Sequence, residues 1–210
     1  MSSRVRIGVI GLGEAGSLIA AGLQAAGADV IGFDPVVPET PPVPLAPDVA
    51  AVVTGADIVI SINSSTAAKK VAEQVAPLLG AGTVYADLNT GTPALKKALA
   101  GLFGDGVFAD VAIMRPVPGL AEKVPMGVAG PGARRFVDLL EQYGMNLEYV
   151  SDVPGEAAAR KLLRSILAKH GFGSCPDKSQ FAPEYGTPAA LAALIADHCD
   201  HCQNAGVVAP

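Results

Sequence analysis

A glycine-rich turn between a short apolar run and a helix-like run is the feature that most constrains the fold of this chain. The stretch VIGLGEAGSLIAAGL (9–23) places Gly11, Gly13 and Gly16 directly after the apolar run VRIGVI (5–10). Glycines at this spacing permit a tight turn, a close approach of a ligand to the backbone, and close packing of helix on strand. The spacing fits either a bare turn or a bound dinucleotide, and the rest of the chain has to distinguish the two.

Strand-like and helix-like runs alternate after this turn. Apolar runs predict strands at 5–10, 29–34, 57–63, 83–89, 106–114, 124–130 and 146–151. Helical periodicity and capping residues predict helices at 14–27, 48–56, 65–82, 92–104, 132–144, 156–170 and 189–202. This alternation predicts an α/β fold with a Rossmann-type, doubly wound and mainly parallel sheet, followed by a short helical C-terminal segment.

The end of the second predicted strand favours the dinucleotide. Asp34 follows Gly11 by a little over 20 residues, where dinucleotide-binding folds place the acid that accepts ribose hydroxyls. Its charge would repel a 2′-phosphate, and Pro35 follows it in place of an arginine, so the sequence favours NAD over NADP. The helix after the turn would face the phosphates with unpaired N–H groups. A helix-capping or surface role is the alternative for Asp34.

The order of the motifs resembles the β-hydroxyacid dehydrogenase family, which includes 6-phosphogluconate dehydrogenase and 3-hydroxyisobutyrate dehydrogenase, over about residues 4–170. SINSS (61–65) is similar to the family's loop beside the nicotinamide ribose, and ADLNT (86–90) to the stretch that borders the nicotinamide. GEAAARKLLRSILAK (155–169) resembles the start of the interdomain helix that carries the catalytic lysine. The stretch 110–131 is most similar to an uncharacterised, 6-phosphogluconate-dehydrogenase-like branch.

The resemblance implies an NAD(P)-dependent oxidoreductase that transfers a hydride between the nicotinamide and a small hydroxyacid-like substrate. The catalytic lysine corresponds to Lys161. The glycine motif and the resemblance together give as predicted cofactor contacts Gly11, Leu12, Gly13, Glu14, Ala15, Gly16, Asp34, Asn63, Ser64, Ser65 and Asn89. Predicted substrate contacts are Asn89, Thr90, Arg115 and Ser165.

Two departures from the family indicate a different substrate. Arg115 lies in Met114-Arg115-Pro116, where better-known members have Ser-Gly-Gly, and Arg164-Ser165 replaces the His-Asn or Asn-Asn after the lysine. A surface or interface role is the alternative for Arg115, and a turn role for Asn89.

Lys161 shares one face of its predicted helix with Ser165 and Lys169, while Leu162 and its apolar neighbours should pack on the nucleotide domain. Apolar surroundings and nearby Arg164 would disfavour the ammonium form, which helps a lysine exchange a proton near neutral pH. A solvated helix face is the alternative.

The last part of the chain differs in composition. All three cysteines and all three histidines lie in residues 170–202. We expect a domain boundary near 154, with residues 1–154 as the NAD(P)-binding domain and residues 155–210 as a reduced helical dimerisation segment. A truncated or frame-shifted tail is one explanation for this composition. With so short a tail, we expect a homodimer partner to supply the second wall of the active-site cleft. For HCDHC (198–202) we expect an exposed or partner-facing helix end and no metal site.

Charge and hydropathy indicate which partners and which location to expect for the protein. The formal charge is −5 with no basic block, so we expect no nucleic acid partner. No apolar run approaches the ~20 residues of a membrane span, and residues 1–10 lack a signal-peptide pattern, so we expect a cytoplasmic protein with no membrane contact. The alternatives to a dehydrogenase are a dinucleotide-binding protein without turnover and an imine reductase on the same scaffold.

Overall fold

The computed structural model describes residues 4–36 and 40–169. The chain divides into two compact units, Met1–Leu162 and Leu163–Pro210, and the architecture below is that of the first. The predicted helix at 189–202 and the HCDHC stretch lie outside the described residues.

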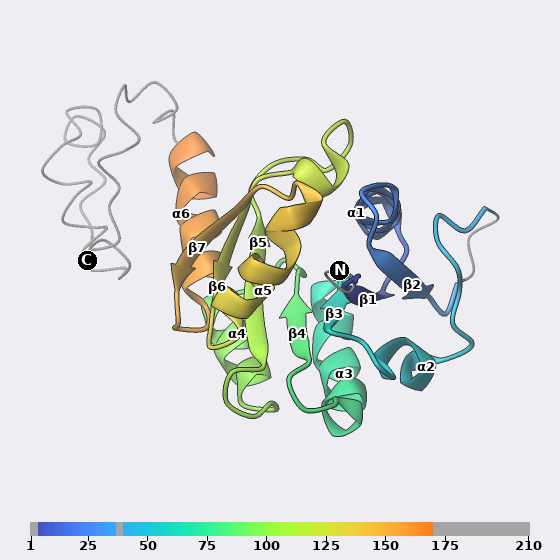
Figure 1. The fold of residues 1–210 in the computed structure, drawn as a ribbon. Helices are drawn as coiled ribbons and strands as arrows, with labels where there is room; N and C mark the ends of the chain where they lie inside the picture. The colour runs from blue at the N-terminus through green and yellow to red at the C-terminus, as the bar shows by residue number, and fades with distance from the viewer. Residues whose placement is uncertain (1–3, 37–39, 170–210) are drawn as a thin grey trace, which may run out of the picture. The chain divides into compact units, whose positions relative to one another are not determined.

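A seven-stranded sheet forms the centre of the first unit, with strand order β2-β1-β3-β4-β5-β6-β7 (Figure 1). The strands are β1 (Arg6–Ile10), β2 (Asp29–Phe33), β3 (Ile58–Ser61), β4 (Val84–Asp87), β5 (Phe108–Ile113), β6 (Met126–Ala129) and β7 (Leu147–Ser151). All neighbouring pairs are parallel except β5 and β6. The connection between these two contains only the 3-10 turn Ala121–Lys123, and strands joined without a crossover helix pair antiparallel.

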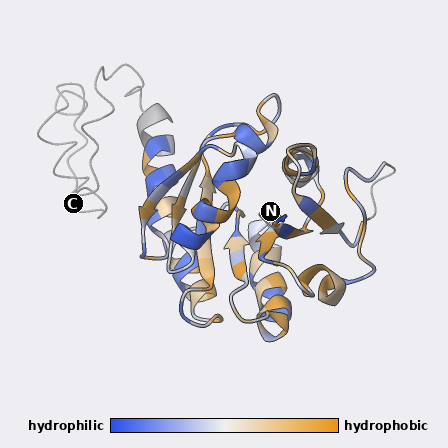
Figure 2. Ribbon diagram, viewed as in Figure 1, coloured by the Kyte–Doolittle hydropathy of each residue, from blue (hydrophilic) through white to orange (hydrophobic). Residues whose placement is uncertain are grey.

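Helices cover both faces of the sheet. They are α1 (Glu14–Ala25), α2 (Val49–Val53), α3 (Ser65–Val75), α4 (Pro93–Ala100), α5 (Ala133–Leu140) and α6 (Glu156–Lys169). One apolar cluster joins the sheet to α1 and α5 through Leu23 and Phe136, and a second joins it to α2, α3 and α4 through residues such as Leu99. Figure 2 shows the apolar residues gathered in the strands and the inward sides of the helices. This arrangement confirms the predicted Rossmann-type, mainly parallel fold.

The predicted helix at 65–82 is too long. Helix α3 ends at Val75 and is followed by the 3-10 turn Ala76–Leu78. Pro77 explains the difference, because proline has no N–H to donate to the preceding turn and its ring crowds that turn.

Candidate functional site

The glycine turn connects β1 to α1, and two of its glycines are required by the packing. Gly11 has φ +105°, and a Cβ on it would collide with the carbonyl oxygen of Ile62. A Cβ on Gly16 would collide with the carbonyl oxygen of Gly11, so this residue lets the helix start against the strand. Gly13 differs, because nothing lies within 4 Å of the position its Cβ would take. The packing of the fold therefore does not require glycine at position 13, and the space beside this residue is open to a ligand.

Helix α1 begins with no side-chain cap. Gly13 is the N-cap residue, and the first helical hydrogen bond runs from the Ser17 N–H to the Gly13 carbonyl at 2.9 Å. The N–H groups of the first turn, on Glu14, Ala15 and Gly16, have no acceptor within the helix. Such a terminus attracts anions through these donors and through the positive end of the helix dipole.

Asp34 lies at the carboxyl end of β2, beside the glycine turn. Its Oδ2 accepts the backbone N–H of Leu12 at 2.7 Å, and its Oδ1 accepts the N–H of Val36 at 2.9 Å. These two bonds fix the carboxylate, and each oxygen keeps a second lone pair for a further donor.

A cavity of about 380 Å³ lies over the start of α1. Its walls come from the glycine turn, from Asp34 and Pro35 after β2, and from the loop after β3. Of the predicted cofactor contacts, it brings together Gly11, Gly13, Glu14, Ala15, Gly16, Asp34, Asn63 and Ser64. Leu12 contributes its backbone N–H to Asp34 while its side chain is buried. Ser65 is the exposed first residue of α3 and does not line the cavity, whereas Ala67 does.

The donor set of this cavity fits a dinucleotide. An uncapped helix start, an open space at Gly13 and a fixed carboxylate at the end of β2 are the groups that a pyrophosphate and a ribose need. Gly11, Gly13 and the first turn of α1 would hold the phosphates, and Asp34 would hold the ribose.

Three polar side chains form one row across β3, β4 and β5, with Ser61 and Asp87 at the carboxyl ends of their strands and Asp110 within β5. Ser61 is the register partner of Asp87, and Asp87 is the register partner of Asp110. All three are fully buried. A buried row of this kind requires hydrogen-bond and charge partners from the neighbouring elements.

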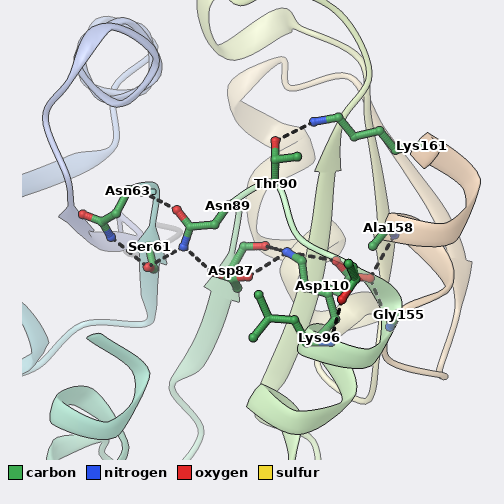
Figure 3. A network of polar contacts seen from close by, with 12 residues as sticks. Ser61, Asn63, Asp87, Asn89, Thr90, Lys96, Asp110, Gly155, Ala158 and Lys161 are labelled. Carbon is green, nitrogen blue, oxygen red and sulfur yellow. Dashed lines mark hydrogen bonds and ion pairs between the residues drawn. The ribbon is translucent and has the colours of Figure 1, made fainter. Parts of the chain in front are cut away.

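Asn89 joins the row to the cavity loop (Figure 3). Its amide Nδ2 donates to Ser61 Oγ at 3.2 Å and to the Asp87 carboxylate, and its Oδ1 accepts the backbone N–H of Asn63. Asn63 in turn donates from Nδ2 to Ser61 at 3.0 Å. Asn89 is only 3% exposed, so both of its N–H donors serve the protein itself. Its predicted direct contacts with cofactor and substrate stay predictions.

Lys96 of α4 supplies the cation for the two acids. Its ammonium donates to Asp87 Oδ2 at 2.7 Å and to the Asp87 carbonyl at 2.8 Å, and it forms an ion pair with Asp110 Oδ1 at 3.1 Å. The other oxygen of Asp110 accepts the backbone N–H groups of Gly155 and Ala158, each at 3.1 Å. These N–H groups belong to the start of α6.

Lys161 lies farther along α6 and reaches the loop after β4. Its ammonium donates to the hydroxyl of Thr90 at 3.0 Å, which brings two of the predicted site residues together. Burial lowers the pKa of Lys161 below the usual lysine value, and the positive charge of Lys96 lowers the pKa further. A lysine with a lowered pKa at such a position can exchange protons closer to neutral pH.

The two other predicted substrate contacts, Arg115 and Ser165, are exposed. Arg115 is exposed in the loop after β5 and forms no ion pair within residues 4–36 and 40–169. Ser165 is an exposed residue of α6 in the second compact unit.

The expectation that Leu162 packs on the nucleotide domain is wrong. Leu162 is 51% exposed, while Ala157 and Ala158 are buried and make the apolar contact at the start of α6. Small side chains let the helix approach the sheet closely there, and this contact ends before Leu162.

Sequence reasoning missed Lys96, Asp87 and Asp110. The signal was present, because VYAD (84–87) and VFAD (107–110) are matching apolar runs that end in an acid. Two acids at equivalent positions of buried neighbouring strands require a cation, and α4 connects these strands.

Within residues 4–36 and 40–169, no cluster of three or more His, Cys, Asp or Glu side chains could hold a metal ion. In the same part of the chain, no helix combines the length and the apolar character needed to cross a bilayer.

The fold and the cavity define a dinucleotide-binding domain of the Rossmann class. Residues 6–106 match the family model described as the NAD binding domain of 6-phosphogluconate dehydrogenase. Over these residues, the match confirms the resemblance that the sequence motifs indicate.

A curated relative and several solved structures are similar to this chain. An uncharacterized 28.5 kDa protein from the 7S RNA 5′ region of Methanothermus fervidus is 29% identical over 122 residues, covering 58% of this chain and 46% of the relative. The structure of a conserved hypothetical protein from Sinorhizobium meliloti 1021 is 36% identical, with a TM-score of 0.73, over 80% of this chain and 61% of that one. The chain thus spans about half the length of the curated relative.

Two more distant structures share the fold. Mycobacterium tuberculosis 3-hydroxyisobutyrate dehydrogenase, solved with L-serine, is 18% identical with a TM-score of 0.68, over 98% of this chain and 74% of that one. An imine reductase variant from Myxococcus stipitatus, solved with NAD+, is 21% identical with a TM-score of 0.67, over 92% of this chain and 71% of that one.

Proposed function

We propose that the chain belongs to an NAD(P)-dependent oxidoreductase that transfers a hydride between the nicotinamide and a small hydroxyacid-like substrate, with Lys161 as the proton-transfer residue. The observation that carries the proposal is the 3.0 Å contact between the Lys161 ammonium and Thr90, on the loop that follows β4. This loop also carries Asn89, which is bonded to the cavity residue Asn63. Lys161 and the cavity are thus linked through the loop after β4, which supports the proposal.

In the oxidation direction, the neutral amine of Lys161 accepts the proton of the substrate hydroxyl at Nζ while the C–H bond gives up its electron pair. A bound dinucleotide would supply the acceptor for that pair as a hydride, so that the substrate would leave as a carbonyl compound. The lowered pKa of Lys161 raises the fraction of neutral amine available near neutral pH. Thr90 orients the lysine side chain through its hydroxyl.

NAD is the proposed cofactor in preference to NADP. The support is the Asp34 carboxylate, which is fixed by two backbone N–H groups and places negative charge where a 2′-phosphate would bind. We also propose a homodimer in the cytoplasm, in which a second copy covers the exposed Leu162 face of α6. Light scattering during size-exclusion chromatography would test the dimer, and a monomer at working concentration would contradict it.

The experiment for the activity is a screen of small hydroxyacids, with NADH absorbance as the signal, for the parent chain and Lys161→Ala. We expect turnover by the parent and a loss of about 100-fold or more in the variant, with NADH affinity retained. NADH binding without turnover of any substrate would favour a dinucleotide-binding protein. Reduction of cyclic imines, with no activity on hydroxyacids, would favour an imine reductase, for which the fold shared with the Myxococcus stipitatus enzyme is the supporting observation.

A further inference from the structure

Lys96 is a buried cation that the proposed reaction does not use directly. It is 1% exposed, although the neighbouring Lys97 on the same helix faces solvent. Taking an ammonium group out of water is costly, and such a group is retained inside a fold only where its partners are closely arranged. Its three polar contacts within the described part of the chain, all between 2.7 and 3.1 Å, are with Asp87 and Asp110.

The two acids bonded to Lys96 contact different parts of the site, one on the side of the dinucleotide cavity and one on the side of Lys161. Asp87 binds the amide of Asn89, and Asn89 accepts the N–H of Asn63 in the wall of the dinucleotide cavity. Asp110 binds the first N–H groups of α6, the helix that carries Lys161. Figure 3 shows this continuous series of contacts from the loop after β3 to the start of α6.

The charges of the series explain its geometry. Two carboxylates and one ammonium leave a formal charge of −1 among side chains that are at most 1% exposed. The N-terminus of α6 carries partial positive charge, and Asp110 accepts two of its N–H groups. Electrostatic attraction to Asp110 therefore stabilises the start of α6 on the sheet, in addition to the packing of Ala157.

Backbone geometry fixes the same point independently. Gly155 has φ +94°, and a Cβ on it would lie 2.7 Å from the carbonyl oxygen of Pro93, the first residue of α4. The starts of α4 and α6 are therefore in close contact, with Lys96 one turn along α4. A displacement of Lys96 or Asp110 would move the start of α6.

We propose that Lys96 is a positioning residue, which holds Asp87 and Asp110 together and thereby fixes Lys161 on α6 relative to the loop that carries Asn89 and Thr90. This inference rests on the proposed function, because it assigns a purpose to the placement of Lys161. Lys96, at 1% exposed, offers no surface to a substrate or cofactor. It acts through Asp87 on the cofactor side and through Asp110 on the lysine side.

The test measures the ionisation of Lys161 without any turnover. Lysines of the intact chain are acetylated with a trace of acetic anhydride across a pH series, and mass spectrometry gives the labelling midpoint of Lys161. In Lys96→Met we expect this midpoint to move to higher pH than in the parent, because a positive charge is lost and the lysine is less firmly held. NADH affinity should weaken about tenfold, the equivalent of one net hydrogen bond. The control is Lys97→Met, which removes the same charge from the solvent side of the same helix and should leave both quantities unchanged.

A second variant guards against loss of folding in the first. Lys96→Met combined with Asp87→Asn keeps the formal buried charge at −1 and keeps Asp110 on the N–H groups of α6. We expect a folded protein in which the Lys161 midpoint still lies at higher pH than in the parent, here because the lysine is less firmly held and not because the net buried charge has changed. A folded variant with the parental midpoint and parental NADH affinity would overturn the inference and leave Lys96 with a role in stability alone. Since neither readout needs a substrate, an inactive parent would count against the proposed function and not against this positioning.

Discussion

The Asp34 carboxylate accepts the backbone N–H of Leu12 at 2.7 Å, and this bond joins the two elements that form the dinucleotide cavity. Leu12 lies between the glycines of the turn after β1, and Asp34 ends β2. The acid that would recognise the ribose is therefore positioned by the same loop that would hold the phosphates. The position of the Asp34 carboxylate does not depend on a ligand. Its charge can therefore be removed without disrupting the glycine turn.

Asp34→Asn should reduce the preference for NADH over NADPH. The side-chain oxygen of asparagine can still accept the Leu12 N–H, while the charge that repels a 2′-phosphate is gone. We expect the ratio of the two dissociation constants to change about tenfold or more in favour of NADPH, measured by fluorescence titration. Asp105→Asn, at an exposed acid away from the cavity, is the control for net charge. An unchanged ratio would show that Asp34 does not face the ribose.

Alanine substitutions of Gly13 and Gly16 should differ in their effect: the first should weaken NADH binding, and the second should lower the stability of the fold. A Cβ on Gly13 meets nothing within 4 Å, so Gly13→Ala should keep the parental melting temperature and lose about tenfold or more in NADH affinity. A Cβ on Gly16 collides with the Gly11 carbonyl, so Gly16→Ala should lower the free energy of unfolding by about 1–3 kcal/mol.

Gly104→Ala is the matched control for the glycine pair, because its Cβ also meets nothing within 4 Å and the residue lies away from the cavity. Calorimetry and NADH titration on the three variants would check the contrast. Equal NADH affinity in Gly13→Ala and the parent would contradict a phosphate site at this turn.

The parts of this molecule that local sequence determines were predictable. The glycine turn, Asp34 and the alternating elements follow from backbone conformation and apolar periodicity, which act over a few residues. The network around Lys96 was not predicted, because on an amphipathic helix one of two adjacent lysines, Lys96 or Lys97, has to be assigned to the buried face. That assignment depends on Asp87 and Asp110, which the parallel register of β4 and β5 brings together. Similarly, Ser65 follows a plausible motif but does not line the cavity, whereas Ala67 of the same helix does.

The pH dependence of turnover should report the lowered pKa of Lys161. In the oxidation direction the neutral amine is required, so kcat/KM should rise with pH below the pKa of Lys161 and level off above it. Because burial and Lys96 lower this pKa, the inflection should lie below the usual lysine value of about 10.4. In the reduction direction the ammonium is the proton donor, so the rate should fall as pH rises through the same range. Steady-state rates for both directions, with Lys161→Ala for comparison, would check this; an identical profile in the variant would exclude Lys161 as the titrating group.

Asp110→Ala should destabilise the fold more than a surface substitution does. The change removes the acceptor of the Gly155 and Ala158 N–H groups and one of the two acids paired with Lys96. Breaking a buried pair by removing one partner costs about 3–5 kcal/mol, so we expect a decrease of that order in the free energy of unfolding.

Asp110→Asn and Asp138→Ala separate the contributions to that loss. The amide oxygen of Asp110→Asn can still accept the N–H groups of α6, so this variant should lose less than the alanine variant. Asp138 is exposed on α5, and Asp138→Ala should stay within about 0.5 kcal/mol of the parent. Urea unfolding of the three variants would measure the differences. A parental free energy of unfolding in Asp110→Ala would mean that α6 is held at the sheet by Ala157 and Ala158 alone.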